Sequence, residues 1–269
     1  APVVTVLRPG LSLLWLSRTD DAPSTYVGRS GDAINVGQSV AAVGHLRPGK
    51  PQELGTVSML VAKGDHRVAL DLAHRWLADN GIMVPKDRAG RVPGAALYSF
   101  HPGGTIGSQW KDLGGFRAAA DRLVPSLGRL GVTAAWILPV EYRSPYWPLD
   151  YYRFMEGLGD GAGYRALVDA LHGAGLKVIQ DIVPHGGSPE AAHNKARPEF
   201  MLRREDGTTL GYWLNDFARE DWQDYVAGVA EHYVREYGIE GYRVDACMGS
   251  KEPNWDPGIT DSRASLAGL

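Results

Sequence analysis

The chain has 269 residues, 44% of them hydrophobic and 22% charged, and its formal net charge at pH 7 is -3. This composition is typical of a globular chain with one large or two smaller domains. The low net charge, with dispersed Lys and Arg, argues against nucleic acid or a membrane surface as a partner. Cys247 is the only cysteine, which excludes an internal disulfide.

The sequence predicts no membrane span, because no run reaches about 18 apolar residues. Residues 1–16 are apolar but interrupted by Arg8, Pro9 and Gly10, and they lack the basic leader of an intact signal peptide. Localisation therefore stays open between secreted or periplasmic and cytoplasmic.

Residues 1–84 predict a small β-rich accessory region that a helix closes. Short β-prone runs separated by Gly, Pro, Asp and Ser occur at 10–17, 32–44 and 55–64. Apolar positions within 65–81 recur at helical spacing, and Asp65 is the expected N-cap. Residues 85–94 then form the predicted linker.

A different pattern begins at residue 95. Continuous apolar runs of strand length occur at 95–100, 132–140, 176–183 and 240–246. Amphipathic stretches with one apolar stripe each lie between them, at 116–130, 164–171 and 222–237. The alternation predicts a parallel sheet, either doubly wound or curled into a barrel, with the functional groups beyond the carboxyl ends of its strands.

Polar or aromatic side chains follow all four predicted strands, and the connections there are long. Aromatic and carboxylate side chains at the carboxyl ends of the strands suit a carbohydrate ligand, because a sugar ring presents an apolar face to aromatic side chains and hydroxyls to carboxylates. The fourth strand carries Arg243 and Asp245 two positions apart, and therefore on one face. A guanidinium in that position favours the charged form of the carboxylate.

Residues 95–250 resemble the first half of the catalytic barrel of the α-amylase family, glycoside hydrolase family 13. The segment GYRVDA in the fourth strand matches that family's motif position by position. By this resemblance Asp245 is the nucleophile of a retaining α-glycoside hydrolase or transglycosidase, and Arg243 keeps it ionised and oriented. Asp181, which ends the third strand, corresponds to the aspartate that supports these two residues.

Further resemblances imply substrate contacts. The segment SPYWPLDYY, after the second strand, resembles a loop of that family. This resemblance implies that Tyr146 is the platform that stacks on the sugar, that Asp150 is its structural partner, and that Trp147 is a neighbouring contact. His185 stands where the family has an asparagine that binds calcium. The replacement weakens the expectation that this chain binds calcium, and no metal ligand is assigned. His185 and His101, which follow the third and first strands, are expected as sugar contacts on the same rim.

Two departures from the family limit the expected activity. Met248 and Gly249 stand where many starch-active members carry Lys-His, so the preferred sugar is left open. The family's general acid ends a fifth strand, which has no counterpart before Leu269, and a retaining mechanism needs two carboxylates. We therefore expect a truncated fragment that is inactive alone, completed by the missing second half of the barrel or by a homo-oligomer.

Two other classes of function remain open from the sequence. One is a metal-dependent barrel enzyme, a sugar isomerase or hydrolase, with Asp181, His185 and Asp245 as ligands. The other is a non-catalytic remnant that binds an oligo- or polysaccharide without turnover. Glu141 ends the second strand, but we do not expect it to act as the acid.

Overall fold

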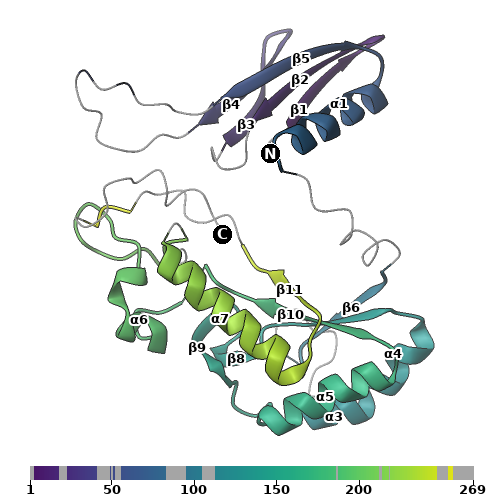
Figure 1. Ribbon diagram of the computed structural model, residues 1–269, viewed down its shortest axis with the longest axis vertical. Coiled ribbons are helices and arrows are strands. Elements are labelled where there is room, and N and C mark those ends of the chain that lie inside the picture. Colours follow the sequence, from purple (N-terminus) through teal and green to yellow (C-terminus); the bar gives the residue numbers. More distant parts are fainter. Residues whose placement is uncertain are drawn as a thin grey trace. The chain divides into compact units, whose positions relative to one another are not determined.

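The computed structural model describes the following residues: 3–17, 23–40, 49, 51, 56–82, 95–104, 113–185, 187–211, 214–217, 219–246 and 254–256. They belong to two compact units, one within Ala1–Arg91 and the other within Val92–Thr260 (Figure 1). The predicted linker, residues 85–94, lies outside the described residues. In the described part of the chain, no helix combines the length and apolar character needed to cross a membrane.

The first unit contains an antiparallel sheet in the order β1-β2-β5. Its elements are β1 (Val3–Arg8), β2 (Leu11–Ser17), β5 (Val57–Lys63), the separate hairpin β3 (Pro23–Ser30) and β4 (Ala33–Val40), and helix α1 (His66–Asp79). Leu14 and Leu16 of β2 are fully buried in a cluster with two alanines of α1. The expected N-cap is confirmed, since the Asp65 side chain accepts a hydrogen bond from the Arg67 N–H at 3.0 Å.

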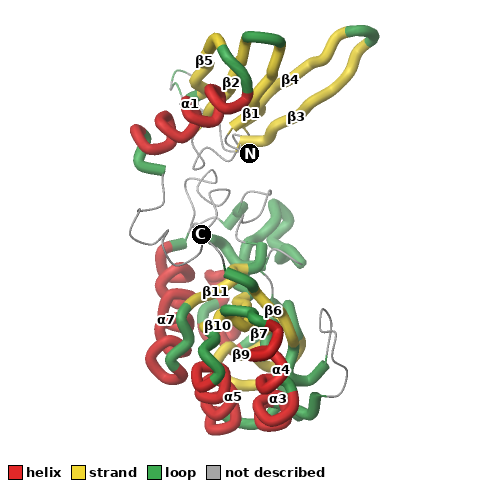
Figure 2. Tube along the Cα trace, turned by 90° about the vertical axis from the view of Figure 1, so that its right-hand side faces the viewer, coloured by secondary structure: helices red, strands yellow, loops and turns green. Residues whose placement is uncertain are grey.

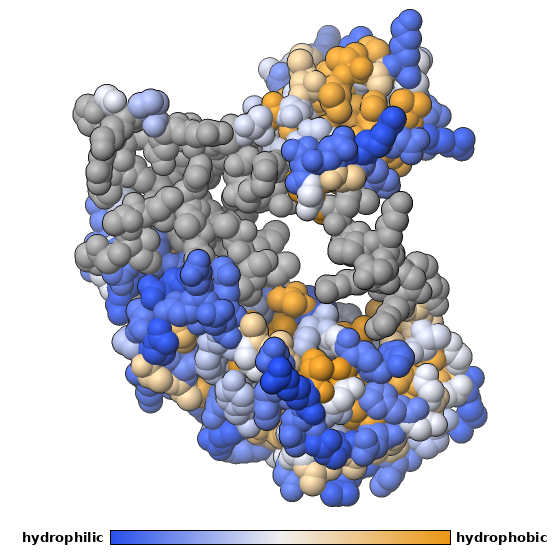
Figure 3. Space-filling model, viewed as in Figure 1, coloured by the Kyte–Doolittle hydropathy of each residue, from blue (hydrophilic) through white to orange (hydrophobic). Residues whose placement is uncertain are grey.

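Apolar side chains are also exposed on this unit, and Figure 3 shows several of them gathered on its visible face. Alternate residues of β5 are solvent-exposed: Val57, Met59 and Val61. Because successive side chains of a strand point to opposite faces, these three lie on one face of the sheet. The other face of β5 is the one that contributes Leu60 to the cluster with α1.

The second unit is built on a parallel sheet in the order β11-β10-β7-β6. Its strands are β6 (Leu97–Phe100), β7 (Ala134–Ile137), β10 (Lys177–Ile182) and β11 (Gly241–Val244). Each strand pairs with the next one of the sheet in chain order, without the reversal that marks a doubly wound fold. Of the two predicted arrangements, the sheet is thus the partial barrel.

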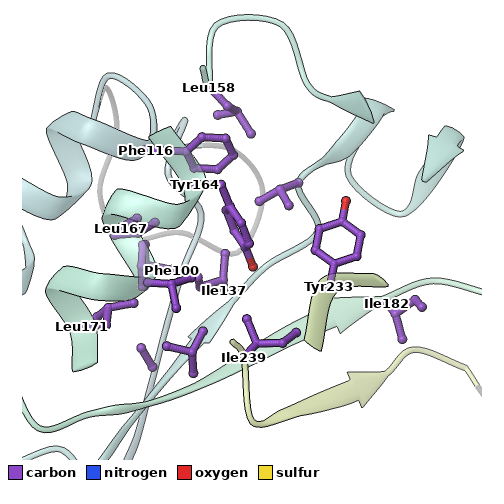
Figure 4. Close-up of a cluster of buried hydrophobic side chains, with 14 of the residues drawn as sticks. Phe100, Phe116, Ile137, Leu158, Tyr164, Leu167, Leu171, Ile182, Tyr233 and Ile239 are labelled. Atoms are coloured by element: carbon purple, nitrogen blue, oxygen red, sulfur yellow. The ribbon is translucent and has the colours of Figure 1, made fainter. Parts of the chain in front are cut away.

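Helices pack on one side of this curved sheet (Figure 2). They are α3 (Phe116–Arg122), α4 (Val124–Leu130), α5 (Gly161–Gly173) and α7 (Glu220–Tyr237). Figure 4 shows the core between helices and sheet, in which Phe116, Tyr164 and Tyr233 are almost completely buried. The single helix expected over 116–130 is wrong, because the chain forms two helices that meet at Leu123, with proline in the first turn of the second.

The connections beyond the strands contain structure that the sequence patterns did not predict. It comprises a hairpin of β8 (Glu141–Ser144) and β9 (Trp147–Phe154), helix α6 (Ala192–Ala196) and a 3-10 turn, η2 (Pro198–Phe200). Tyr151 of β9 is buried, and its hydroxyl donates to the Val183 carbonyl at 2.7 Å. The Tyr233 hydroxyl of α7 in turn donates to the Tyr151 carbonyl at 2.7 Å, so the hairpin is tied to strand end and helix.

Candidate active site

The polar side chains of the candidate site share one face of the sheet. Asp181 of β10 pairs in register with Arg243 of β11, and Trp136 of β7 pairs with Ile179, two residues before Asp181. Because side chains alternate along a strand, Trp136, Asp181 and Arg243 point to the same side. Asp245 follows β11 on this face, and its backbone N–H donates to the Ile182 carbonyl at 2.8 Å.

Asp181 is fully buried and accepts hydrogen bonds from three side chains. Its Oδ2 lies 3.2 Å from the indole Nε1 of Trp136 and 3.3 Å from the Tyr146 hydroxyl. Arg243 Nη1 lies 3.1 and 3.2 Å from its two oxygens. Burial raises the pKa of Asp181, and the hydrogen bond and positive charge of Arg243 oppose this rise.

Arg243 connects this buried carboxylate to Asp245. The same Nη1 lies 2.5 Å from Asp245 Oδ1. The Asp245 side chain is 13% exposed, whereas that of Asp181 is not exposed at all. Of the two carboxylates that Arg243 holds, Asp245 is therefore the one that can meet a molecule arriving from solvent.

His185 holds the other oxygen of Asp245. Its Nε2 lies 2.9 Å from Asp245 Oδ2, its side chain is fully buried, and its carbonyl accepts from the Leu214 N–H. Since a carboxylate only accepts, this ring nitrogen is the donor. Calcium prefers oxygen ligands, so an imidazole committed to Asp245 does not fit the calcium site that the α-amylase resemblance implies.

Tyr146 reaches Asp181 from the turn between β8 and β9. Its backbone has φ 61°, a left-handed conformation that non-glycine residues rarely adopt and that is common at functional sites. Burial raises the pKa of Tyr146 to about 12, with a further contribution from the charge of Asp181, so its hydroxyl stays a donor. The predicted stacking of Tyr146 on a sugar remains a prediction.

The three other predicted contact residues have different surroundings. Trp147 is 37% exposed at the start of β9, and Asp150 on the same strand accepts the Tyr152 N–H at 2.9 Å. His101 is fully buried, with Nε2 3.1 Å from the Pro139 carbonyl and Nδ1 accepting the Gly103 N–H at 3.0 Å. Burial lowers the pKa of His101 to about 4, and these bonds favour a structural role for the neutral ring.

A second polar network lies on the opposite side of β10. Gln180 is buried there, its Nε2 donates to Glu141 Oε1 at 2.9 Å, and its Oε1 accepts from the Tyr164 hydroxyl of α5. Burial raises the pKa of Glu141 to about 7. Because Gln180 and Asp181 are successive strand residues, Glu141 and Asp245 belong to different faces of the sheet, in line with the expectation that Glu141 is not the acid.

The metal-dependent alternative receives no geometric support. Within the described ranges, no group of three His, Cys, Asp or Glu side chains is arranged to hold a metal ion. Asp181 and His185 are instead committed to Arg243 and Asp245.

Sequence reasoning missed Trp136. Its indole contacts Asp181, and its ring lies 5.4 Å from the guanidinium carbon of Arg243. The available signal was the composition of the strand, because Trp136 is an aromatic residue with an N–H donor in a strand otherwise made of alanine and isoleucine. The alternation of side chains along a strand then places it on one definite face of the sheet.

Sequence relatives of the chain are 1,4-alpha-glucan branching enzymes named GlgB. The one from Nocardia farcinica is 30% identical over an alignment of 196 positions, which covers 64% of this chain and 25% of the relative. The one from Pseudomonas putida is 27% identical over an alignment of 254 positions, which covers 83% of this chain and 34% of the relative. The chain thus spans about a quarter to a third of these relatives, and no family model matches it.

Solved structures with a similar fold include an alpha-amylase from Lactobacillus plantarum, with a TM-score of 0.51 and 23% identity. The match covers 58% of this chain and 39% of that one. Trehalose-6-phosphate hydrolase from Bacillus licheniformis also has a TM-score of 0.51, with 18% identity over 65% of this chain and 39% of its own. At these identities the likeness concerns the fold, which is that of a TIM-barrel amylase over part of its length.

Proposed function

We propose that this chain, which belongs to the α-amylase family (glycoside hydrolase family 13), carries the nucleophile side of a retaining site for α-glycosides. Asp245 is the nucleophile in this proposal. The observation that carries it is the arrangement of Asp245, whose carboxylate is partly exposed while Arg243 and His185 each bind one of its oxygens. Two donors keep the carboxylate oriented, and the guanidinium favours its charged form.

The chemistry assigned to Asp245 is the part of the nucleophile in a double displacement. An oxygen of Asp245 attacks the anomeric carbon, the bond to the leaving group breaks, and a covalent glycosyl ester forms with inversion. Water or an acceptor sugar hydroxyl then attacks the same carbon, which restores the configuration and frees Asp245. Asp181 acts on Arg243 and does not touch the substrate, since it is fully buried.

The names of the relatives support an α-glucan as the substrate class, because they are 1,4-alpha-glucan branching enzymes. The exposed ring of Trp147, next to Tyr146 on the hairpin, supplies an aromatic surface of the kind that sugar rings bind. Hydrolysis and transfer use the same ester and differ only in the acceptor. The proton donor is not assigned to a residue of this chain.

The test uses a substrate that needs no proton donor. An α-glucosyl fluoride with a second fluorine at carbon 5 loses fluoride without protonation, and its ester with an enzyme carboxylate is hydrolysed slowly. Incubated with the purified chain, it should add one fluoroglucosyl group to Asp245, detected by mass spectrometry of the peptides. Asp245→Asn should abolish the label, and Asp169→Asn, which changes an exposed carboxylate of α5, should leave it unchanged.

The same experiment separates catalysis from binding alone. A chain that binds maltooligosaccharides but acquires no label on Asp245 would support the second candidate function, a carbohydrate-binding module. Label on another carboxylate would reject Asp245 as the nucleophile.

A further inference from the structure

Four side chains on the inner face of the sheet form one connected series. Trp136 donates from its indole Nε1 to Asp181 Oδ2, Asp181 binds Arg243 Nη1, and the same Nη1 binds Asp245 Oδ1. The series crosses three neighbouring strands, β7, β10 and β11, whose pairing fixes its spacing. Only its last member, Asp245, is assigned to the reaction itself.

Trp136 has two contacts within this series. Its N–H binds the buried Asp181 carboxylate at 3.2 Å, and its ring lies 5.4 Å from the Arg243 guanidinium carbon, within the range of a cation–π interaction. The Arg243 side chain is 40% exposed, so it has room to adopt other rotamers unless its neighbours hold it. Phenylalanine at this position would keep a six-membered aromatic ring and would remove the N–H together with part of the indole surface.

We propose that Trp136 is a positioning residue, which fixes Asp181 and Arg243 so that the guanidinium stays on Asp245. This inference rests on the proposed function for its effect on the reaction, but the contacts of Trp136 are testable without it. The indole orients one oxygen of Asp181 and leaves the carboxylate free to bind Arg243 through both. Without that donor, Asp181 and Arg243 would share a less defined geometry, and Asp245 would lose part of its orientation.

A change in the ionisation of Asp181 is also expected. Burial raises the pKa of Asp181, while the hydrogen bonds of Arg243 and Trp136 lower it, so loss of the indole N–H raises it further. Asp181 is also faced by Tyr146 and Asp245 and, from the other side of its strand, by Glu141. Its protonation removes the charge that holds Arg243, so the acid limb of any reaction on Asp245 moves to higher pH.

The first readout is the rate of labelling of Asp245 by the 5-fluoro glucosyl fluoride. Trp136→Phe should lower the rate constant at saturating reagent at least about tenfold, as expected for loss of a hydrogen bond to a charged group. The reagent concentration at half-maximal rate should change little, and the acid limb should move to higher pH. Trp76→Phe, at a partly buried tryptophan of α1 in the first unit, should match the wild type. An unchanged rate and pH profile in Trp136→Phe would refute the positioning role.

The second readout does not depend on the reaction. In chain with nitrogen-15-labelled tryptophan, the indole signal lost in Trp136→Phe identifies Trp136. Asp181→Asn should shift this signal more than any other indole signal, and a smaller shift than the others show would contradict the contact. If the wild-type chain acquires no label while the Trp136 signal responds to Asp181→Asn, the proposed function fails and the contact stands. If label forms but the signal does not respond, this inference fails alone.

Discussion

The Glu141 carboxyl group is buried, and its hydrogen-bonding partners among the described residues include no cation. Gln180 and the Val140 N–H bind its oxygens, and burial raises its pKa from 4.5 to about 7. The folded state therefore binds more protons than the unfolded state between these two pH values. Stability should fall as pH rises through this window and stay at the lower level above it.

Replacement by glutamine should remove this pH dependence. Glu141→Gln keeps an oxygen acceptor and cannot ionise, so the variant does not lose this stability as the pH rises. Between pH 4.5 and pH 8, the free energy of unfolding of the wild type should therefore fall by about 3 kcal/mol relative to that of the variant. Urea unfolding of both chains across this range measures it. Glu231→Gln, at an exposed position of α7, is the control. A difference that does not vary with pH would show that Glu141 does not titrate in this range.

At the scale of elements, one glycine within helix α7 and the glycine that caps it have opposite expected responses to substitution. Gly238 caps the helix with φ 78°, a left-handed conformation that costs alanine about 1 kcal/mol. Gly228 is an exposed interior position with open space around an added Cβ, where alanine should stabilise the helix by about 0.5–1 kcal/mol. Thermal unfolding of Gly238→Ala and Gly228→Ala should give shifts of opposite sign. Two shifts of equal sign would contradict this account of the helix end.

The elements of the barrel could be predicted because their signals are local. Continuous apolar runs located β6, β7, β10 and β11, and a Gly-Tyr-Arg-Val-Asp-Ala match located Arg243 and Asp245. The hairpin β8–β9 could not be found in this way, since Tyr151 is buried by contacts with Val183 and Tyr233, which lie far away in the sequence. The same holds for the site, where the partner of His185 was not evident until the structure placed Asp245 beside it.

At the scale of the whole molecule, the parallel sheet ends at two strands that pair on one side only within the described residues, β6 and β11. Each carries an exposed apolar side chain, Leu97 at 53% and Val244 at 40%. Val244 also lines an apolar groove of about 420 Å³ with Tyr242 and residues of α7. Unpaired strand edges with apolar side chains favour association between chains.

We therefore expect this chain, purified by itself, to associate in a concentration-dependent manner. Val244→Lys should shift the weight-average mass in sedimentation toward the monomer, because a charge on the edge strand opposes pairing between chains. Lys replacing the exposed Val61 of β5 in the first unit is the comparison. A mass that falls with Val61→Lys but not with Val244→Lys would place the association on the first unit instead of the barrel edge.

Strand β10 joins the two polar networks, because Gln180 belongs to the network of Glu141 and Asp181 to that of Arg243. A shift of this strand by one position would exchange the two faces and would turn the aspartate toward Tyr164 and the amide toward the guanidinium. Both sets of hydrogen bonds would be lost together. Gln180 and Asp181 together therefore specify the register of β10, because a sheet with this strand shifted by one residue would lose hydrogen bonds on both of its faces.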